Sequence, residues 1–223
     1  MDDLKINIPK IYPKGKSLTN YPPSKNYSKQ VLLIWPGKFG AFDPDFPNSC
    51  FYLAKALIDQ GWEPEILDMQ IEDYKNIDYH KYLFVGVSSM SGYQLNHARE
   101  VSKYIKEIAP SCPIIYGGDH PNTEDVSTAK SEFVDYAIRG EGENSMIQFA
   151  QAMYDWSDVG VVDGLTAFES NGNLIRNEKG DFYTDFEKVS HLPYHLVDVK
   201  KYPGITDKWP YLSSKGCPFT CSF

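Results

Sequence analysis

Short apolar runs alternate with stretches of helical periodicity from Val31 to about Trp156, and this alternation is the feature that most constrains the fold. Five runs rich in Val, Ile and Leu predict strands of a sheet that is buried on both faces. These runs are residues 31–35, 65–68, 83–88, 113–116 and 134–138. Three intervening stretches have one apolar side and predict helices. They are residues 49–60, 94–109 and 142–156.

Parallel strands are joined by right-handed crossovers, so this order of elements predicts an α/β fold. We expect a doubly wound, parallel five-stranded sheet of the Rossmann-like or flavodoxin-like type, with strand order 2-1-3-4-5. In such a sheet a ligand binds beyond the carboxyl ends of the strands, at the point where the strand order reverses. The loops at this edge are rich in Gly and Ser, which allow a flat ligand to approach the backbone closely. They are residues 36–47, 88–92, 117–121 and 139–143.

The flanking segments have a different composition. Residues 1–29 contain four prolines and six lysines without apolar periodicity, which predicts an extended amino-terminal arm. Residues 164–168 and 173–176 flank Asn171-Gly172, a pair that suits a tight turn, and predict a hairpin that extends or caps the domain. We therefore expect an α/β domain over residues 30–160 and a hairpin with a connector over residues 161–210.

Overall charge and cysteine content exclude some classes of protein. The net charge of −8, from 22 basic and 30 acidic residues, opposes unspecific binding to nucleic acid and favours a small-molecule or protein partner. The four cysteines are unremarkable for this length, and no apolar run is long enough for a signal peptide or a membrane helix. A cytoplasmic location without membrane association is expected.

The last residues carry the motif Cys217-Pro-Phe-Thr-Cys221. Closely spaced thiolates suit an iron–sulfur cluster, whereas the alternatives are two ordinary thiols or a disulfide in a secreted protein. Residues 211–223 resemble the first strand and cluster loop of the radical S-adenosylmethionine enzymes, in which Cys-x-x-x-Cys-x-x-Cys holds three irons of a [4Fe–4S] cluster. In that family the fourth iron binds S-adenosylmethionine. The resemblance implies that Cys217 and Cys221 are metal ligands and that residues 211–223 begin an incomplete barrel of a larger enzyme.

Three further runs resemble the signature runs of the cobalamin-binding domains in cobalamin-dependent radical S-adenosylmethionine enzymes. They are Val-Gly-Val-Ser-Ser-Met at 85–90, Ile-Tyr-Gly-Gly-Asp-His-Pro at 115–121 and Ala-Ile-Arg-Gly-Glu-Gly-Glu at 137–143. The resemblance extends over roughly residues 30–223. It implies that the corrin lies over the carboxyl edge of the sheet, in the base-off form, with its nucleotide tail running down between the strands. The cofactor contacts that it implies are Ser88, Ser89, Gly117, Gly118, Gly140, Glu141 and Gly142.

The loop after the first strand departs from other cobalamin domains, which carry Asp-x-His-x-x-Gly there. Residues 37–47 contain no histidine, so a lower histidine ligand to cobalt from this loop is excluded. Imidazole is a capable cobalt ligand in principle, and His120 lies in a loop near the expected corrin. His120 also precedes Pro121 at a helix start, where we expect a structural role or a supporting role behind the residues that touch the corrin. We assign no chemistry to His97.

The resemblance implies that the complete enzyme cleaves S-adenosylmethionine to a 5′-deoxyadenosyl radical, which takes a hydrogen from substrate, and that methylcobalamin can then deliver a methyl group. For this chain alone we expect cobalamin binding without catalysis, and we assign no catalytic residue. One alternative is a cobalamin-free domain for docking or substrate recognition in such an enzyme. Another is a flavodoxin-like protein that binds flavin or a nucleotide, although Gly-x-Gly-x-x-Gly and Walker-type loops are absent after the first strand.

Overall fold

The computed structural model describes residues 28–37, 46–155, 157–169, 171–181 and 191–202. The predicted arm up to residue 27, the metal ligands Cys217 and Cys221, and the barrel start at 211–223 lie outside the described residues. The connector predicted within 161–210 is described only in part.

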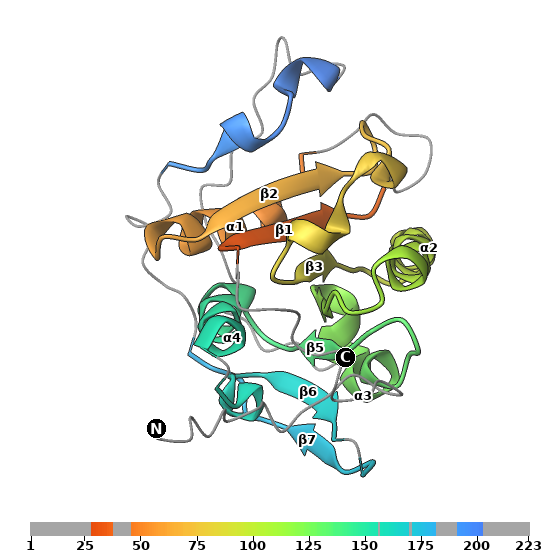
Figure 1. Cartoon of the computed structure of the whole chain (residues 1–223), viewed down its shortest axis with the longest axis vertical. Coiled ribbons are helices and arrows are strands. Elements are labelled where there is room, and N and C mark those ends of the chain that lie inside the picture. Colours follow the sequence, from red (N-terminus) through yellow and green to blue (C-terminus); the bar gives the residue numbers. More distant parts are fainter. Residues whose placement is uncertain (1–27, 38–45, 156, 170, 182–190, 203–223) are drawn as a thin grey trace, which may run out of the picture.

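The described part of the chain forms one seven-stranded sheet in the order β2-β1-β3-β4-β5-β6-β7 (Figure 1). The strands are β1 (Gln30–Trp35), β2 (Glu63–Asp68), β3 (Val85–Ser88), β4 (Ile114–Gly117), β5 (Tyr136–Ile138), β6 (Leu165–Phe168) and β7 (Leu174–Arg176). The first five strands are parallel, which confirms the predicted order 2-1-3-4-5. Their carboxyl ends therefore meet at one edge of the sheet.

The sheet has seven strands rather than the five predicted, because the hairpin of β6 and β7 joins it. Strand β6 runs antiparallel to β5, with Ala137 opposite Thr166, and β7 pairs antiparallel with β6. The backbone N–H and C=O groups along the outer side of β5 need partners, and β6 supplies them. The hairpin thus extends the domain instead of capping it.

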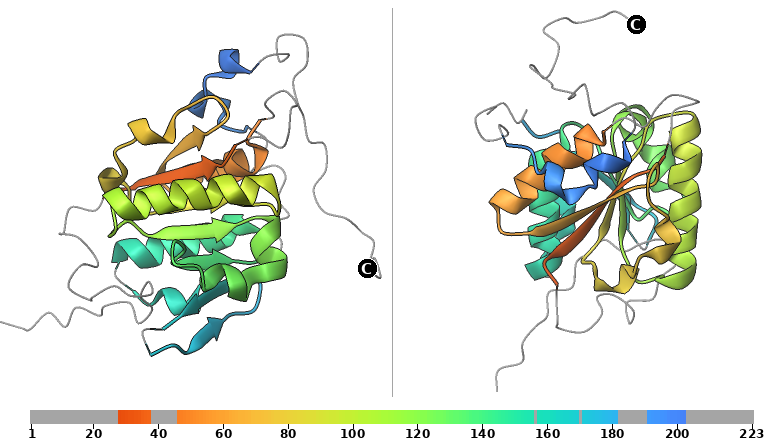
Figure 2. Two further views of the ribbon diagram at one scale, coloured as in Figure 1. Left: turned by 90° about the vertical axis from the view of Figure 1, so that its right-hand side faces the viewer. Right: turned by 90° about the horizontal axis from the view of Figure 1, so that it is seen from above.

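Helices cover both faces of the sheet, as the doubly wound prediction requires (Figures 1 and 2). Helices α1 (Asn48–Asp59) and α4 (Gly142–Asp155) lie on one face, and α2 (Tyr93–Ile108) and α3 (Asp119–Ala129) lie on the other. Helix α3 was not assigned from the sequence, although a helix start was placed near Pro121, because its residues lack a clear apolar stripe. None of the helices in the described ranges combines the length and apolar character needed to cross a membrane.

The core has two layers because successive residues of a strand face opposite sides of the sheet. On β1, Val31 and Leu33 belong to the layer under α1 and α4, whereas Leu32 and Ile34 belong to the layer under α2. All four side chains are at most 1% exposed. The near-continuous apolar run of β1 is therefore explained by burial on both faces.

A buried ionic group joins the hairpin to the parallel sheet. The carboxylate of Asp125, on α3, lies 2.7 Å from Nε of Arg176 on β7 and 3.0 Å from Nε of Arg139 after β5. Its Oδ2 also accepts a hydrogen bond of 2.7 Å from the Thr166 hydroxyl on β6. Burial opposes ionisation of Asp125, but the hydrogen bonds from Arg176 and Thr166 and the two guanidinium charges lower its pKa below the ordinary value. Arg139, which the sequence placed only in an edge loop, is therefore part of a structural ion cluster.

Candidate functional site

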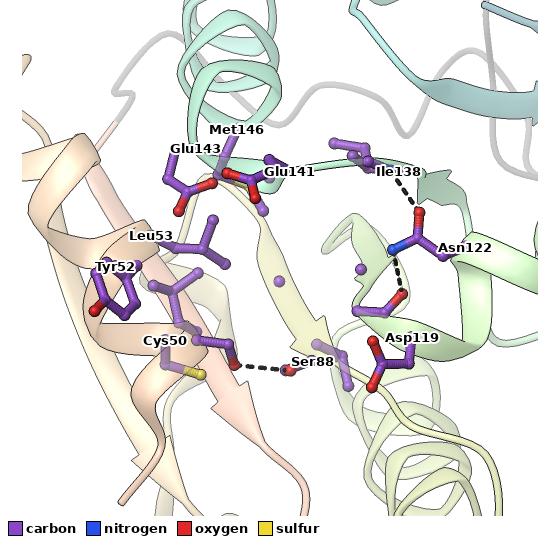
Figure 3. Close-up of a pocket in the computed structure, with 18 residues that line it drawn as sticks. Cys50, Tyr52, Leu53, Ser88, Asp119, Asn122, Ile138, Glu141, Glu143 and Met146 are labelled. Carbon is purple, nitrogen blue, oxygen red and sulfur yellow. Dashed lines mark hydrogen bonds between the residues drawn. The ribbon is translucent and has the colours of Figure 1, made fainter. Parts of the chain in front are cut away.

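A cavity of about 270 Å³ opens at the carboxyl edge of the sheet, on the face covered by α1 and α4 (Figure 3). Its residues come from β1, β3, β4 and β5, from the turns after β4 and β5, and from the amino-terminal halves of α1, α3 and α4. They are Leu33, Ser49, Cys50, Tyr52, Leu53, Gly86, Val87, Ser88, Gly117, Gly118, Asp119, Asn122, Ile138, Gly140, Glu141, Gly142, Glu143 and Met146. The position agrees with the ligand edge predicted for a doubly wound sheet.

The floor of the cavity is apolar and is kept open by a strand glycine. Leu33 on β1 and Met146 on α4 line it, and Gly86 on β3 lies between them. A Cβ atom at Gly86 would lie 3.1 Å from Leu33 Cδ2 and 3.4 Å from Met146 Cε, so any side chain there would occupy the floor. A flat apolar group entering from the edge would lie against the strands themselves.

Hydrogen bonds fix the rim of the cavity. The hydroxyls of Ser49 on α1 and Ser88 on β3 lie 3.0 Å apart. Asn122 on α3 donates from Nδ2 to the carbonyl of Gly118 at 3.2 Å, and its Oδ1 accepts from the amide of Gly140 at 2.6 Å. One side chain thus holds the loops after β4 and β5 at a set separation.

The turn after β4 depends on glycine at position 118. Gly118 has a φ of +97°, and a Cβ atom there would lie 2.8 Å from the carbonyl oxygen of Ser89. The same carbonyl accepts a hydrogen bond of 3.0 Å from the amide of His120, in the first turn of α3. Both the backbone conformation and the close approach exclude a larger residue.

The electrostatics of the cavity combine carboxylates with helix amino termini. Asp119, Glu141 and Glu143 line it, and none of its described lining residues is a lysine or arginine. Helices α1, α3 and α4 all begin at the cavity, so the positive ends of three helix dipoles lie beside it. The amides of Asn48 in α1 and His120 in α3 already donate to the carbonyls of Phe46 and Ser89. The site therefore places carboxylate acceptors beside the amino-terminal ends of helices.

Cys50 on α1 lines the cavity but is not a thiolate. Burial and the nearby Asp68 carboxylate raise its pKa to about 12, so the thiol stays protonated at neutral pH. Within the described ranges no group of three or more His, Cys, Asp or Glu residues is placed to hold a metal ion.

Six of the seven residues predicted to contact a cofactor line this cavity. They are Ser88, Gly117, Gly118, Gly140, Glu141 and Gly142. Ser89 does not line it: the residue is 1% exposed, and its amide and hydroxyl both donate to the carbonyl of Gly117, at 2.7 and 3.1 Å. Ser89 therefore fixes the backbone at Gly117 and presents no group to the cavity.

His120 does not line this cavity. It lines a second cavity of about 470 Å³ between α2 and α3, and its Nδ1 lies 2.9 Å from the Ser91 hydroxyl. The role expected for His120 stays a prediction.

Sequence reasoning missed two rim residues, Ser49 and Asn122. Ser49 was read as the first residue of a helix, although its place after the strand-one loop also puts it at the ligand edge. Asn122 lies one turn beyond the Gly-Gly pair, and nothing in its local sequence indicates that it reaches Gly140.

Comparison with families of known proteins gives a direct match. Residues 46–150 match the family described as the B12 binding domain. This span includes α1, the part of α4 up to residue 150 and every lining residue of the cavity except Leu33.

Two curated relatives resemble most of the chain. The anaerobic magnesium-protoporphyrin IX monomethyl ester cyclase of Synechocystis is 27% identical over 189 residues, which is 79% of this chain and 37% of the cyclase. A protein of Pyrococcus horikoshii, named an uncharacterized methyltransferase, is 24% identical over 218 residues, which is 93% of this chain and 44% of that protein. The chain thus spans less than half the length of these relatives.

Solved structures show the same fold. The radical S-adenosylmethionine methyltransferase TsrM of Kitasatospora setae superposes with a TM-score of 0.58 at 25% identity, over 68% of this chain and 30% of TsrM. The cobalamin-dependent S-adenosylmethionine radical enzyme OxsB, solved with aqua-cobalamin, superposes with a TM-score of 0.56 at 15% identity, over 72% of this chain and 25% of OxsB.

Proposed function

Because residues 46–150 match the B12-binding domain family, we propose that this chain is the cobalamin-binding portion of a radical S-adenosylmethionine enzyme. The observation that carries the proposal is the cavity at the carboxyl edge, with its floor opened by Gly86. The corrin would cover the edge of the sheet and the nucleotide tail would enter the cavity. We propose residues 30–160 as the domain that does this.

The chemistry of the lining fits the groups of cobalamin. The periphery of the corrin carries amide groups, whose N–H donors match the carboxylates of Asp119, Glu141 and Glu143. The benzimidazole base is flat and apolar, as is the floor beside Leu33 and Met146. The phosphodiester of the tail is an anion, and the amino termini of helices at the rim stabilise anions.

Within this site each predicted residue has a distinct task. Ser88 and Glu141 would bond with polar groups of the corrin or its tail, whereas the glycines at 117, 118, 140 and 142 would let the ligand approach the backbone. Ser89 would act indirectly, by holding Gly117 in place. When bound, cobalamin supplies a cobalt centre that can carry a methyl group.

The remaining chemistry belongs to the whole enzyme. The S-adenosylmethionine, the [4Fe–4S] cluster and the substrate would be held by a carboxyl-terminal barrel, whose first two cluster thiolates would be Cys217 and Cys221. A methyl transfer is the reaction we favour, since TsrM and the Pyrococcus relative are both named methyltransferases. The chain by itself would bind cobalamin without turnover, in the cytoplasm.

Titration with hydroxocobalamin tests the proposal. The purified chain is expected to retain the corrin after desalting and to give a base-off absorption spectrum without histidine coordination, because the corrin's own base would occupy the cavity. Cobinamide, which lacks the nucleotide tail, should be retained more weakly because it leaves the cavity empty. No retention at high ligand concentration would contradict the proposal and favour a cobalamin-free docking domain.

A further inference from the structure

Tyr202, in the connector, contacts the carboxyl edge of the sheet at the end of β2. This residue follows a 3₁₀ turn, Val199–Lys201, and is 2% exposed. Its hydroxyl donates a 2.5 Å hydrogen bond to Oδ2 of Asp68, the last residue of β2. Figure 1 shows the residues before Tyr202, in blue, beside β2 at the end of the sheet.

The Asp68 carboxylate is buried at the end of β2 and is 1% exposed. Its Oδ1 also accepts from the backbone amide of Gln70 at 2.9 Å. Burial raises the pKa of Asp68 above its ordinary value, and burial together with the bond to Asp68 raises the pKa of Tyr202. A phenol that donates to a buried carboxylate forms one of the stronger hydrogen bonds of a protein interior, because one partner is charged.

The ring of Tyr202 also fixes the start of α1. Its centroid lies 4.8 Å from that of Phe46, and the Tyr194 ring lies 5.9 Å from Phe46 and 4.9 Å from Phe51. Phe46 is 3% exposed, and its carbonyl accepts a 2.8 Å hydrogen bond from the amide of Asn48, the first residue of α1. The connector rings therefore pack against Phe46, just before α1, and against Phe51 in the first turn of α1.

That first turn is part of the cavity wall. Ser49 and Cys50 line the cavity, and Ser49 reaches the rim residue Ser88. A shift of Phe46 would move these residues relative to β3. Contact with the connector and the shape of the cavity are therefore linked through a few buried side chains.

From these contacts we infer that Tyr202 is a positioning residue for the cobalamin site, and that it couples occupancy of the cavity to the connector segment that precedes Cys217 in the sequence. The inference rests on the proposed function. Because coupling is reciprocal, a connector held by Asp68 and Phe46 favours cobalamin binding, and bound cobalamin in turn holds the connector.

The test compares two buried tyrosines in the full chain. Tyr202→Phe removes the bond to Asp68 and is expected to weaken hydroxocobalamin binding by about tenfold, which corresponds to about 1.4 kcal/mol. Asp68→Asn should weaken binding in the same direction, and the double variant should lose less than the sum of the two.

Tyr79→Phe is the matched control. Tyr79 is 0% exposed and donates to the carbonyl of Tyr74 at 2.7 Å, but it lies in the core layer under α2, away from the cavity. This variant should lower thermal stability and leave the affinity for hydroxocobalamin unchanged. If Tyr202 has a purely structural role, Tyr202→Phe should behave as Tyr79→Phe does, with lower thermal stability and unchanged affinity for hydroxocobalamin.

Hydrogen exchange gives a second readout. Hydroxocobalamin should slow deuterium exchange at the amides of Lys201 and Tyr202, which donate to the carbonyls of Asp198 and Val199. The slowing should be lost in Tyr202→Phe at saturating ligand. Two results would overturn the inference while the proposed function stands. One is an unchanged affinity of Tyr202→Phe for hydroxocobalamin, and the other is deuterium exchange at Lys201 and Tyr202 of the wild type that does not change when the ligand is added. A wild-type chain that binds no hydroxocobalamin would overturn both.

Discussion

Replacing Asp125 by alanine is expected to lower the free energy of unfolding by about 3–5 kcal/mol, because it removes one partner of a buried ion cluster. The Asp125 side chain is 8% exposed and that of Arg139 is 7% exposed, so water cannot replace the lost carboxylate. Arg139 would keep its hydrogen bonds to Thr166 and to the carbonyl of Asn177, but its charge would remain unpaired. Urea unfolding at neutral pH, followed by circular dichroism, measures the loss.

The matched control is Asp59→Ala, which breaks the exposed i,i+4 pair with Lys55 on α1. This change should cost about 0.3–0.5 kcal/mol, as exposed helix pairs do. Equal losses for the two variants would show that burial does not set the strength of the Asp125 cluster.

The Asp125 contribution also has a defined pH dependence. The pKa of Asp125 is lower in the folded state than in the unfolded state. Its contribution to the free energy of unfolding is therefore complete above the unfolded pKa of about 3.9 and is lost as the pH falls through the folded pKa. The stability difference between wild type and Asp125→Ala should therefore be constant from neutral pH down to about pH 5 and shrink below about pH 4. A difference that grows on acidification would contradict the assigned direction of the shift.

Replacing Gly117 by valine is expected to weaken hydroxocobalamin binding by about 10- to 100-fold, if overpacking costs about 1–3 kcal/mol in the bound state. Gly117 ends β4 and lines the cavity, and a Cβ atom there meets nothing within 4 Å. Ile115 faces the layer under α1 and α4, so by strand alternation position 117 points to the same side. The new side chain would occupy the cavity without a clash in the free protein.

Stability should change by less than about 0.5 kcal/mol in Gly117→Val, because valine suits a strand and displaces nothing. Ser131→Val, in the second cavity between α2 and α3, adds bulk away from the site and should leave the affinity unchanged. Gly118→Val is not an equivalent test, since its φ of +97° and the Ser89 carbonyl would strain the backbone. Full affinity in Gly117→Val would place the ligand elsewhere.

Local patterns account for much of what was predicted correctly. Alternation of apolar runs and helical stripes predicted the five parallel strands β1 to β5 and the helices α1, α2 and α4. The right-handedness of crossovers then predicted the order of these strands. The same reasoning predicted the edge of the sheet at which the cavity lies. Helix α3 escaped because its polar sequence has no stripe, and it is held by contacts such as those of Asp125 rather than by its own periodicity.

The site was predicted in part for a related reason. Loops rich in glycine can be recognised from the local sequence, and six of the seven predicted contacts line one cavity. Ser88 and Ser89 are neighbours of the same type, however, and only the packed loop shows that one faces the cavity while the other bonds with Gly117. Asn122 reaches Gly140 across two loops, a relation that no local pattern contains.

By itself the sequence determined the class of fold, the order of the parallel strands and the edge of the sheet at which the cavity opens, because these follow from periodicity, crossover handedness and turn chemistry within short segments. Tertiary structure alone decided that the hairpin joins the sheet, that Asp125 gathers Arg139 and Arg176, and that Tyr202 meets Asp68. These partners are up to 134 positions apart in the chain. Their meeting depends on how helices and connector pack together, which sets distances and orientations that no single segment encodes.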